Sequence, residues 1–259
     1  MSEALTASAK HVYLDIVGFT RDRSVEAQTE IIGVLNAVVE QSLGDLALDN
    51  ETRILLPTGD GICIVLLNID DPYDAHIQLA LGILKRIAEH NTTTSDRMRQ
   101  FEVRIGINSN IDNLVTDVNG NRNVAGAGIN MAQRIMSQAD GGQVLVGHSV
   151  FEVLQNREAY MDTFRSFTAK GKHSIQFPVH QYIGGDCPRL DTSVPTAFQQ
   201  RKQAEPKLTE LAAYMIGIAM QNRDIFVQYR GKETGHSSSL VWLWYAAKDE
   251  QGIFTVDRH

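Results

Sequence analysis

The stretch His11-Val-Tyr-Leu-Asp-Ile-Val-Gly-Phe-Thr20 joins an apolar strand pattern to one carboxylate and a glycine turn. Burying Asp15 in such a run costs free energy unless a cation or strong hydrogen-bond donors neutralise the charge. Gly18 allows a tight turn, and the backbone N–H groups after it can face an anion at the start of a helix. Taken alone, the segment is either a metal site or a strand that ends in a satisfied aspartate.

A second carboxylate stands at the tip of a predicted hairpin. Residues 53–67 form two short apolar runs joined at Thr58-Gly-Asp-Gly61, and Asp-Gly between such runs favours a hairpin. Asp60 is therefore expected at the tip. Hard dications such as Mg²⁺ or Mn²⁺ prefer oxygen ligands and keep waters and substrate phosphates in their shell, so two carboxylates on adjacent strand ends suffice. Two such ions could clamp a phosphoryl displacement.

Composition describes an ordinary globular protein with enough apolar material for a sizeable core, since 43% of the 259 residues are apolar and 21% are charged. The net charge of −7 argues against nucleic acid or an anionic membrane as a partner. Cys63 and Cys187 give neither a disulfide framework nor a metal spacing, which fits a reducing compartment. Without a signal peptide or an apolar run of ~20 residues, the expected location is cytoplasmic.

Hydrophobic spacing predicts alternating strands and helices up to about residue 184. Ser24 is expected to cap the first helix. The later elements are, in order, a helix at 72–91, a strand at 101–107, a long loop or hairpin at 108–125, a helix at 127–138, a short strand at 144–146, a short helix at 149–155 and a hairpin at 165–183. The whole order predicts an α+β fold with a ferredoxin-like core, an antiparallel-rich sheet with helices on its face.

The sequence changes in texture beyond residue 185. We expect a main domain over residues 1–185, a linker or wrapping arm over 186–207, and a small C-terminal α+β extension over 208–259. The elements predicted in the extension are a helix at 208–222 and strands at 224–229, 240–246 and 252–256. Two roles stay open for it: an extra layer or dimer seam, or a ligand-binding module with aromatic contacts.

Five motifs stand in a fixed order along these elements. They are Asp15-Ile-Val-Gly-Phe-Thr20, Thr58-Gly-Asp-Gly61, Val103-Arg-Ile-Gly-Ile107, Asn123-x-x-Gly-x-x-x-Asn130-x-x-x-Arg134 and Lys170-Gly171. The set spans roughly residues 10–184 and resembles the class III nucleotidyl cyclases, the adenylate and guanylate cyclase superfamily. The resemblance implies a phosphorus-oxygen lyase that turns a nucleoside triphosphate into a cyclic nucleotide and pyrophosphate.

In that family two catalytic domains pack head to tail and share their active sites, so the resemblance implies a homodimer with two equivalent sites. It also implies that Asp15, Asp60 and the backbone carbonyl of Ile16 hold two divalent cations, Mn²⁺ or Mg²⁺, on one protomer. Arg104 of the same protomer would contact the polyphosphate.

The resemblance assigns the other half of the site to the partner. Asn130 would orient the ribose, Arg134 would stabilise charge on the α-phosphate, and Lys170 would hold the terminal phosphates. Phe19 and Thr20, in the turn after the first strand, are further expected to contact the nucleotide.

Each of these residues also has an ordinary structural role open to it. Arg104 could pair with a surface carboxylate, and Arg134 could pair with Asp140. Asn130 could hydrogen-bond a neighbour on its helix, and Lys170 could be a lysine in a turn, surrounded by water.

Two other classes of protein stay open for the domain. One is a degenerate cyclase fold that only binds nucleotides. The other is a diguanylate cyclase or palm polymerase, against which the absence of a Gly-Gly-Asp-Glu-Phe hairpin speaks.

The two positions that read the base in purine cyclases carry Leu56 and Asn123 here. Leu56 offers no hydrogen bond, whereas the Asn123 carboxamide has a donor and an acceptor and can pair with uracil or cytosine by flipping. Asn110 also replaces the glycine expected after the Arg104 strand. These departures resemble the Pycsar pyrimidine cyclases of bacterial antiphage defence, whose cyclic UMP or cyclic CMP activates a separate effector protein. We expect UTP as substrate, then CTP, then ATP.

Overall fold

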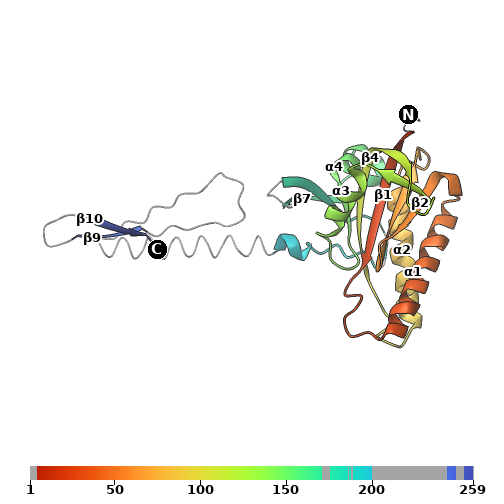
Figure 1. The fold of residues 1–259 in the computed structure, drawn as a ribbon, viewed down its shortest axis with the longest axis horizontal. Coiled ribbons are helices and arrows are strands. Elements are labelled where there is room, and N and C mark those ends of the chain that lie inside the picture. The colour runs from red at the N-terminus through yellow and green to blue at the C-terminus, as the bar shows by residue number, and fades with distance from the viewer. Residues whose placement is uncertain are drawn as a thin grey trace. The chain divides into compact units, whose positions relative to one another are not determined.

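A computed structural model describes residues 5–170, 176–185, 187, 189–199, 244–248 and 254–258. The chain divides into two compact units, residues 1–169 with 178–196 and residues 170–177 with 197–259. The first unit holds nearly all of the elements drawn from red to green in Figure 1. The domain boundaries expected from the sequence stay predictions.

The central sheet has eight strands in the order β2-β3-β1-β4-β6-β8-β7, with β5 paired to β4. The bounds are β1 Thr6–Ile16, β2 Arg53–Pro57, β3 Gly61–Leu67, β4 Val103–Thr116, β5 Arg122–Ala125, β6 Val144–Gly147, β7 Phe164–Lys170 and β8 Gln176–Tyr182. β1 runs antiparallel to both β3 and β4, and β4 runs parallel to β6. The antiparallel-rich α+β fold predicted from the sequence is confirmed.

Helices cover both faces of this sheet (Figure 1). Their bounds are α1 Val25–Asp45, α2 Ala75–Thr93, α3 Gly128–Met136 and α4 His148–Leu154, with short 3₁₀ helices at Asn50–Thr52 and Glu158–Tyr160. Ser24 caps α1 as predicted, since its Oγ accepts a hydrogen bond from the Ala27 N–H at 3.2 Å. Within the described part of the chain, no helix has the length and apolar character needed to cross a membrane.

Alternation along β1 separates an apolar face from a mixed one. Val12, Leu14 and Ile16 are buried in a large cluster with residues of α1 and α2. Tyr13 points the other way, into a smaller cluster with residues of α3. Because successive side chains of a strand point to opposite faces, Asp15 lies on the α3 side.

Two predicted segments differ from the structure in length. The strand expected at 101–107 begins at Val103 and continues to Thr116, because β4 pairs with β1 along all of Thr6–Ile16. Of the two alternatives for residues 108–125, the hairpin is therefore correct: β4 turns back into β5. The helix expected from residue 72 begins later, at Ala75.

In the second unit, β9 (Trp244–Lys248) and β10 (Phe254–Arg258) form an antiparallel pair. These strands overlap two of the three predicted there. The helix predicted at 208–222 and the strand predicted at 224–229 lie outside the described residues.

Candidate active site

Two carboxylates meet at one end of three adjacent strands. Asp15, near the end of β1, lies opposite Gly61 of β3 on one side and opposite Arg104 of β4 on the other. Asp60 comes directly before Gly61, and its backbone carbonyl accepts a hydrogen bond from the Ile16 N–H at 3.1 Å. The sheet register therefore brings together the residues that the sequence suggested as metal ligands.

The β2–β3 hairpin depends on glycine at two places. Gly59 has a φ of +99°, a conformation that L side chains rarely adopt. At Gly61, an added Cβ would lie 2.2 Å from the carbonyl oxygen of Leu14, so a side chain there would push β3 away from β1. The hairpin closes with a 2.9 Å hydrogen bond from the Thr58 N–H to the Gly61 carbonyl. The two glycines thus hold Asp60 against the end of β1.

Arg104 engages one oxygen of Asp15. Its Nε and Nη2 donate to Oδ2 at 3.1 and 2.7 Å, and the Asp15 side chain is 17% exposed. Burial raises the pKa of the Asp15 carboxyl above its ordinary value, the Arg104 hydrogen bonds oppose this rise, and the neighbouring Asp60 charge adds to it. One guanidinium thus only partly offsets the cost of holding two carboxylates together.

The donor set fits a hard divalent cation. Two carboxylates side by side supply oxygen ligands and an excess of negative charge that a dication would neutralise. Among the residues that the structure describes, no group of three or more His, Cys, Asp or Glu side chains could form a complete cage. A cation bound by Asp15 and Asp60 would therefore complete its shell with backbone carbonyls, water or phosphate, as Mg²⁺ commonly does.

The turn after β1 is fixed by an arginine that sequence analysis missed. Gly18 has a φ of +61°. The Arg23 guanidinium donates to the Gly18 carbonyl at 2.5 Å and to the carbonyls of residues 98 and 100 at 3.0 and 2.9 Å. Phe19 packs partly buried against the main core, whereas Thr20 is exposed. No motif marks Arg23, because its partners are backbone atoms distant in sequence.

Helix α3 presents Asn130 and Arg134 to solvent. Both residues are exposed, and their side chains have no hydrogen-bond or ion-pair partner in the described part of the chain. Asp140, the carboxylate that could have paired with Arg134, instead accepts a 2.6 Å hydrogen bond from the Thr196 N–H. The helix itself lies directly on the sheet, since an added Cβ at Gly106 would come within 2.3 Å of the Met136 nitrogen.

The other expected nucleotide-binding residues are more scattered. Leu56 is half-buried on β2, and β2 contacts β5, which carries Asn123. The Asn123 Oδ1 accepts a 2.7 Å hydrogen bond from the Val124 N–H. Lys170 is the exposed last residue of β7 and belongs to the second compact unit.

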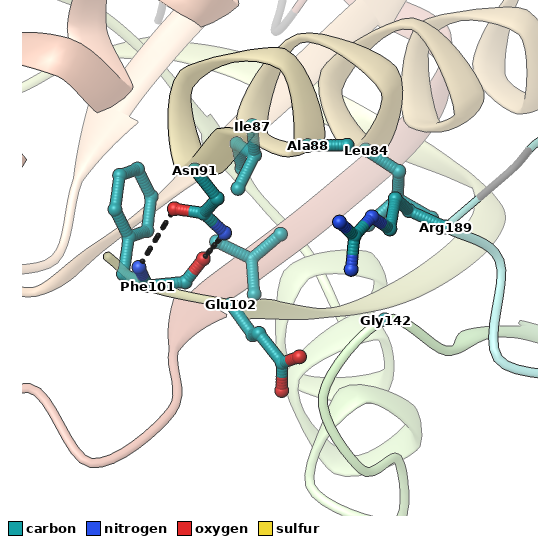
Figure 2. Close-up of a pocket in the computed structure, with 9 residues that line it drawn as sticks. Leu84, Ile87, Ala88, Asn91, Phe101, Glu102, Gly142 and Arg189 are labelled. Atoms are coloured by element: carbon teal, nitrogen blue, oxygen red, sulfur yellow. Dashed lines mark hydrogen bonds between the residues drawn. The ribbon is translucent and has the colours of Figure 1, made fainter. Parts of the chain in front are cut away.

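A hollow on the α2 side of the sheet has a different lining (Figure 2). Leu84, Ile87, Ala88 and Asn91 of α2 form one wall, and residues 101–103 with Gly142 and Arg189 form the rest. Its volume is about 40 Å³, room for only a few waters and far too little for a nucleotide. None of the expected metal or nucleotide residues lines this hollow or the open one of about 480 Å³ beside it.

Comparisons with known proteins identify the family to which the domain belongs. Residues 6–181 match the model of the adenylate and guanylate cyclase catalytic domain. No curated protein sequence matches the chain.

Solved structures show the same fold. The guanylyl cyclase Cya2 covers 73% of this chain and 99% of its own, at 17% identity and a TM-score of 0.59. The adenylate/guanylate cyclase/hydrolase from Silicibacter pomeroyi covers 71% and 100%, at 18% identity and a TM-score of 0.54. The catalytic core of a rhodopsin-guanylyl cyclase in complex with ATPαS likewise covers 71% of this chain and 100% of its own, at 18% identity and a TM-score of 0.54. The chain belongs to the family of adenylate and guanylate cyclase catalytic domains.

Proposed function

We propose that this domain converts UTP into 3′,5′-cyclic UMP and pyrophosphate, at sites shared between two copies of the chain. Membership of the cyclase family supplies the class of reaction. The observation that carries the proposal is the meeting of Asp15, Asp60 and Arg104 at the end of three adjacent strands, because the reaction needs cations at a polyphosphate.

In this proposal Asp15, Asp60 and the Ile16 carbonyl hold two divalent cations, Mn²⁺ or Mg²⁺. When bound, such ions lower the pKa of an attacking hydroxyl and neutralise phosphate charge. Arg104 holds Asp15 with two of its five N–H donors, which leaves the others for a phosphate oxygen. Phe19 and Thr20 lie in the turn that Arg23 fixes, where they would line the nucleotide.

The exposure of Asn130 and Arg134 favours a site completed by a second chain. An amide and a guanidinium that have no partner among the residues described by the structure are free to reach a neighbour's substrate. Arg134 would then stand as a fixed cation where charge grows on the α-phosphate, and Asn130 would orient the ribose so that the 3′-hydroxyl meets the phosphorus. Lys170 would contact the terminal phosphates.

The choice of UTP rests on Leu56 and Asn123. Leu56 cannot hydrogen-bond a purine edge, and a carboxamide such as that of Asn123 can pair with uracil. CTP is the next candidate, since the same carboxamide can flip to pair with cytosine. By likeness to the pyrimidine cyclases of antiphage defence, the cyclic nucleotide would act as a second messenger on a separate effector protein.

The test is to incubate the purified chain with Mn²⁺ and each of the four ribonucleoside triphosphates separately, and to identify the products by mass spectrometry. We expect cyclic UMP from UTP in far greater yield than any other cyclic nucleotide. An Asp60→Asn variant should form the cyclic product about 10³-fold more slowly. Asp45→Asn, which alters an exposed ion pair with Arg86 on α2, should match the wild type.

Each alternative result contradicts a stated part of the proposal. Cyclic CMP alone would move the substrate to CTP. Cyclic AMP or cyclic GMP would exclude a pyrimidine pocket built from Leu56 and Asn123. Tight nucleotide binding without any product would make the domain a nucleotide sensor and remove the catalytic roles assigned to Asn130 and Arg134.

A further inference from the structure

A buried pair of ionisable side chains lies on the α3 side of the sheet. His11 of β1 and Asp112 of β4 have no exposed side-chain area, and His11 Nε2 lies 3.0 Å from Asp112 Oδ2. Asn108, four residues before Asp112, is the residue opposite His11, so the two side chains reach toward each other along the sheet. Ala9 lies between them on the same face and contributes only a methyl group. Asn110 Nδ2 donates to the other oxygen of Asp112.

This pair is a poor device for stability. A buried imidazole and carboxylate each lose their hydration, and such pairs are often no better than apolar residues of similar volume. Burial lowers the pKa of His11 and the charge of Asp112 opposes that shift. The 3.0 Å contact is not aligned as a hydrogen bond.

The backbone that leads into α3 rests on this pair. An added Cβ at Gly126 would lie 1.9 Å from Asp112 Oδ1. At Gly128, the first residue of α3, an added Cβ would lie 2.3 Å from His11 Cε1 and 2.6 Å from Asp112 Oδ2. The carboxylate thus sits beneath the N-terminal turn of a helix, where negative charge is favoured. Only glycine lets the chain approach so closely.

Helix α3 is therefore seated on the sheet at two points. Its N-terminal turn rests on His11 and Asp112, and its C-terminal turn rests on Gly106. Asn130 is two residues after Gly128 and follows the first seat, whereas Arg134 is nearer the second. A disturbance of the buried pair should shift Asn130 more than Arg134.

We propose that His11 and Asp112 are positioning residues, which set the height and rotation of the first turn of α3 and thereby place the Asn130 carboxamide. This inference rests on the proposed function, in which Asn130 orients the ribose of the substrate. It predicts that damage to the pair lowers the rate of the chemical step while the metal and phosphate contacts stay in place.

The test compares variants of the pair with a glycine control. Asp112→Asn keeps the volume of the side chain and removes its charge. Gly128→Ala adds a Cβ that would push the first turn of α3 away from His11 and Asp112. In both we expect kcat to fall by about 10- to 100-fold, with KM for the triphosphate within about threefold. The control is Gly82→Ala in α2, where the added Cβ would lie at an ordinary contact distance of 3.5 Å from the nearest atom, Ser42 Oγ. This variant should leave kcat and KM unchanged.

A double variant separates positioning from simple stability. His11→Leu with Asp112→Leu replaces the pair by apolar side chains, so the thermal midpoint Tm should equal or exceed that of the wild type. We expect its kcat to stay low. A double variant with both a wild-type Tm and a wild-type kcat would show that the positioning role is wrong. A normal kcat in the Asp112→Asn and Gly128→Ala variants would show the same.

Amide hydrogen exchange gives a readout that does not depend on cyclase activity. Exchange at residues 131–134, whose N–H groups bond back to the first turn of α3, should be faster in Asp112→Asn than in the wild type, with α2 unchanged. Equal exchange in the two proteins would show that His11 and Asp112 do not support the first turn of α3. A wild-type chain that makes no cyclic nucleotide would instead refute the proposed function, and the exchange experiment would still decide whether the pair fixes α3.

Discussion

The two faces of the central sheet use the same strands for different purposes. On the α1 and α2 side, Leu14 and Ile16 are almost fully buried among apolar neighbours. On the α3 side, Asp15 stands between them in sequence and meets an arginine and a second carboxylate at the strand end. The first face gains stability from burial, whereas the second holds charges close together at a cost in stability. Substitutions on the two faces should therefore separate stability from activity.

The largest effect is expected at the carboxylate pair. Asp60→Asn should lower the cyclisation rate by about 10³-fold, because a ligand of the proposed cations is lost. Its Tm should not fall, since the variant relieves repulsion between Asp60 and Asp15. Initial rates and thermal melts of the same samples would check both halves. A large fall in Tm with a normal rate would place Asp60 in the fold and not in the site.

The opposite pattern is expected on the apolar face. Leu14→Ala should lower the free energy of unfolding by about 2–5 kcal/mol, because it leaves a cavity at a fully buried position. The rate per folded molecule should stay near that of the wild type. Urea unfolding gives the stability, and Leu5→Ala, at a position that is 67% exposed, serves as the control with little expected change. A loss of rate without a loss of stability would mean that the faces are not separable.

His76 should produce the next largest effect, through pH. It is buried in α2, and burial lowers its pKa to about 3. The folded state therefore resists protonation, and the stability that this group contributes is present above about pH 6.5 and lost as the pH falls toward 3. Between pH 8 and pH 5 the loss amounts to about 2 kcal/mol. Urea unfolding of His76→Leu at both pH values should show a difference smaller by that amount, and an unchanged difference would contradict it.

The smallest effect is expected from cation binding at Asp15. Because the pKa of Asp15 is raised, its ionised form opposes folding. Its contribution to stability is therefore present below about pH 4 and is lost as the pH rises through the folded-state pKa. At pH 7 a bound cation would offset this loss. Mn²⁺ should raise the Tm of the wild type by a few degrees at pH 7. Asp15→Asn should remove that response. A variant that is stabilised by Mn²⁺ as strongly as the wild type would show that the cation binds elsewhere.

Local patterns sufficed to predict the order of elements. Apolar spacing and turn residues mark the helices, the Ser24 cap and the hairpin at Asp60, because each depends on neighbours in sequence. The full length of β4 could not be predicted in this way. Its second half is held by pairing with β1, and that segment is rich in Asn and Asp, which favour turns when taken alone.

The same distinction applies to the candidate site. Asp15 and Asp60 stand in recognisable motifs at strand ends, so their meeting could be predicted. The pair of His11 and Asp112 could not, because the two residues meet only through the register of β1 with β4. The hydrogen bonds from Arg104 to Asp15 likewise follow from pairing across the sheet. The sequence left two expectations for Arg104: a contact with the polyphosphate, by resemblance, or an ion pair with a surface carboxylate.

The shared site is tested most directly by mixing two inactive variants. Asp60→Ala removes the metal half of the site, and Arg134→Ala removes the half that a partner would supply. A mixed dimer would hold one site with both defects and one site with neither. At equal amounts about half of the dimers are mixed, so we predict recovery of about one quarter of wild-type activity. Distinct tags on the two variants establish that mixed dimers form. Tagged mixed dimers without activity, or an active Arg134→Ala variant on its own, would contradict a site built from two chains.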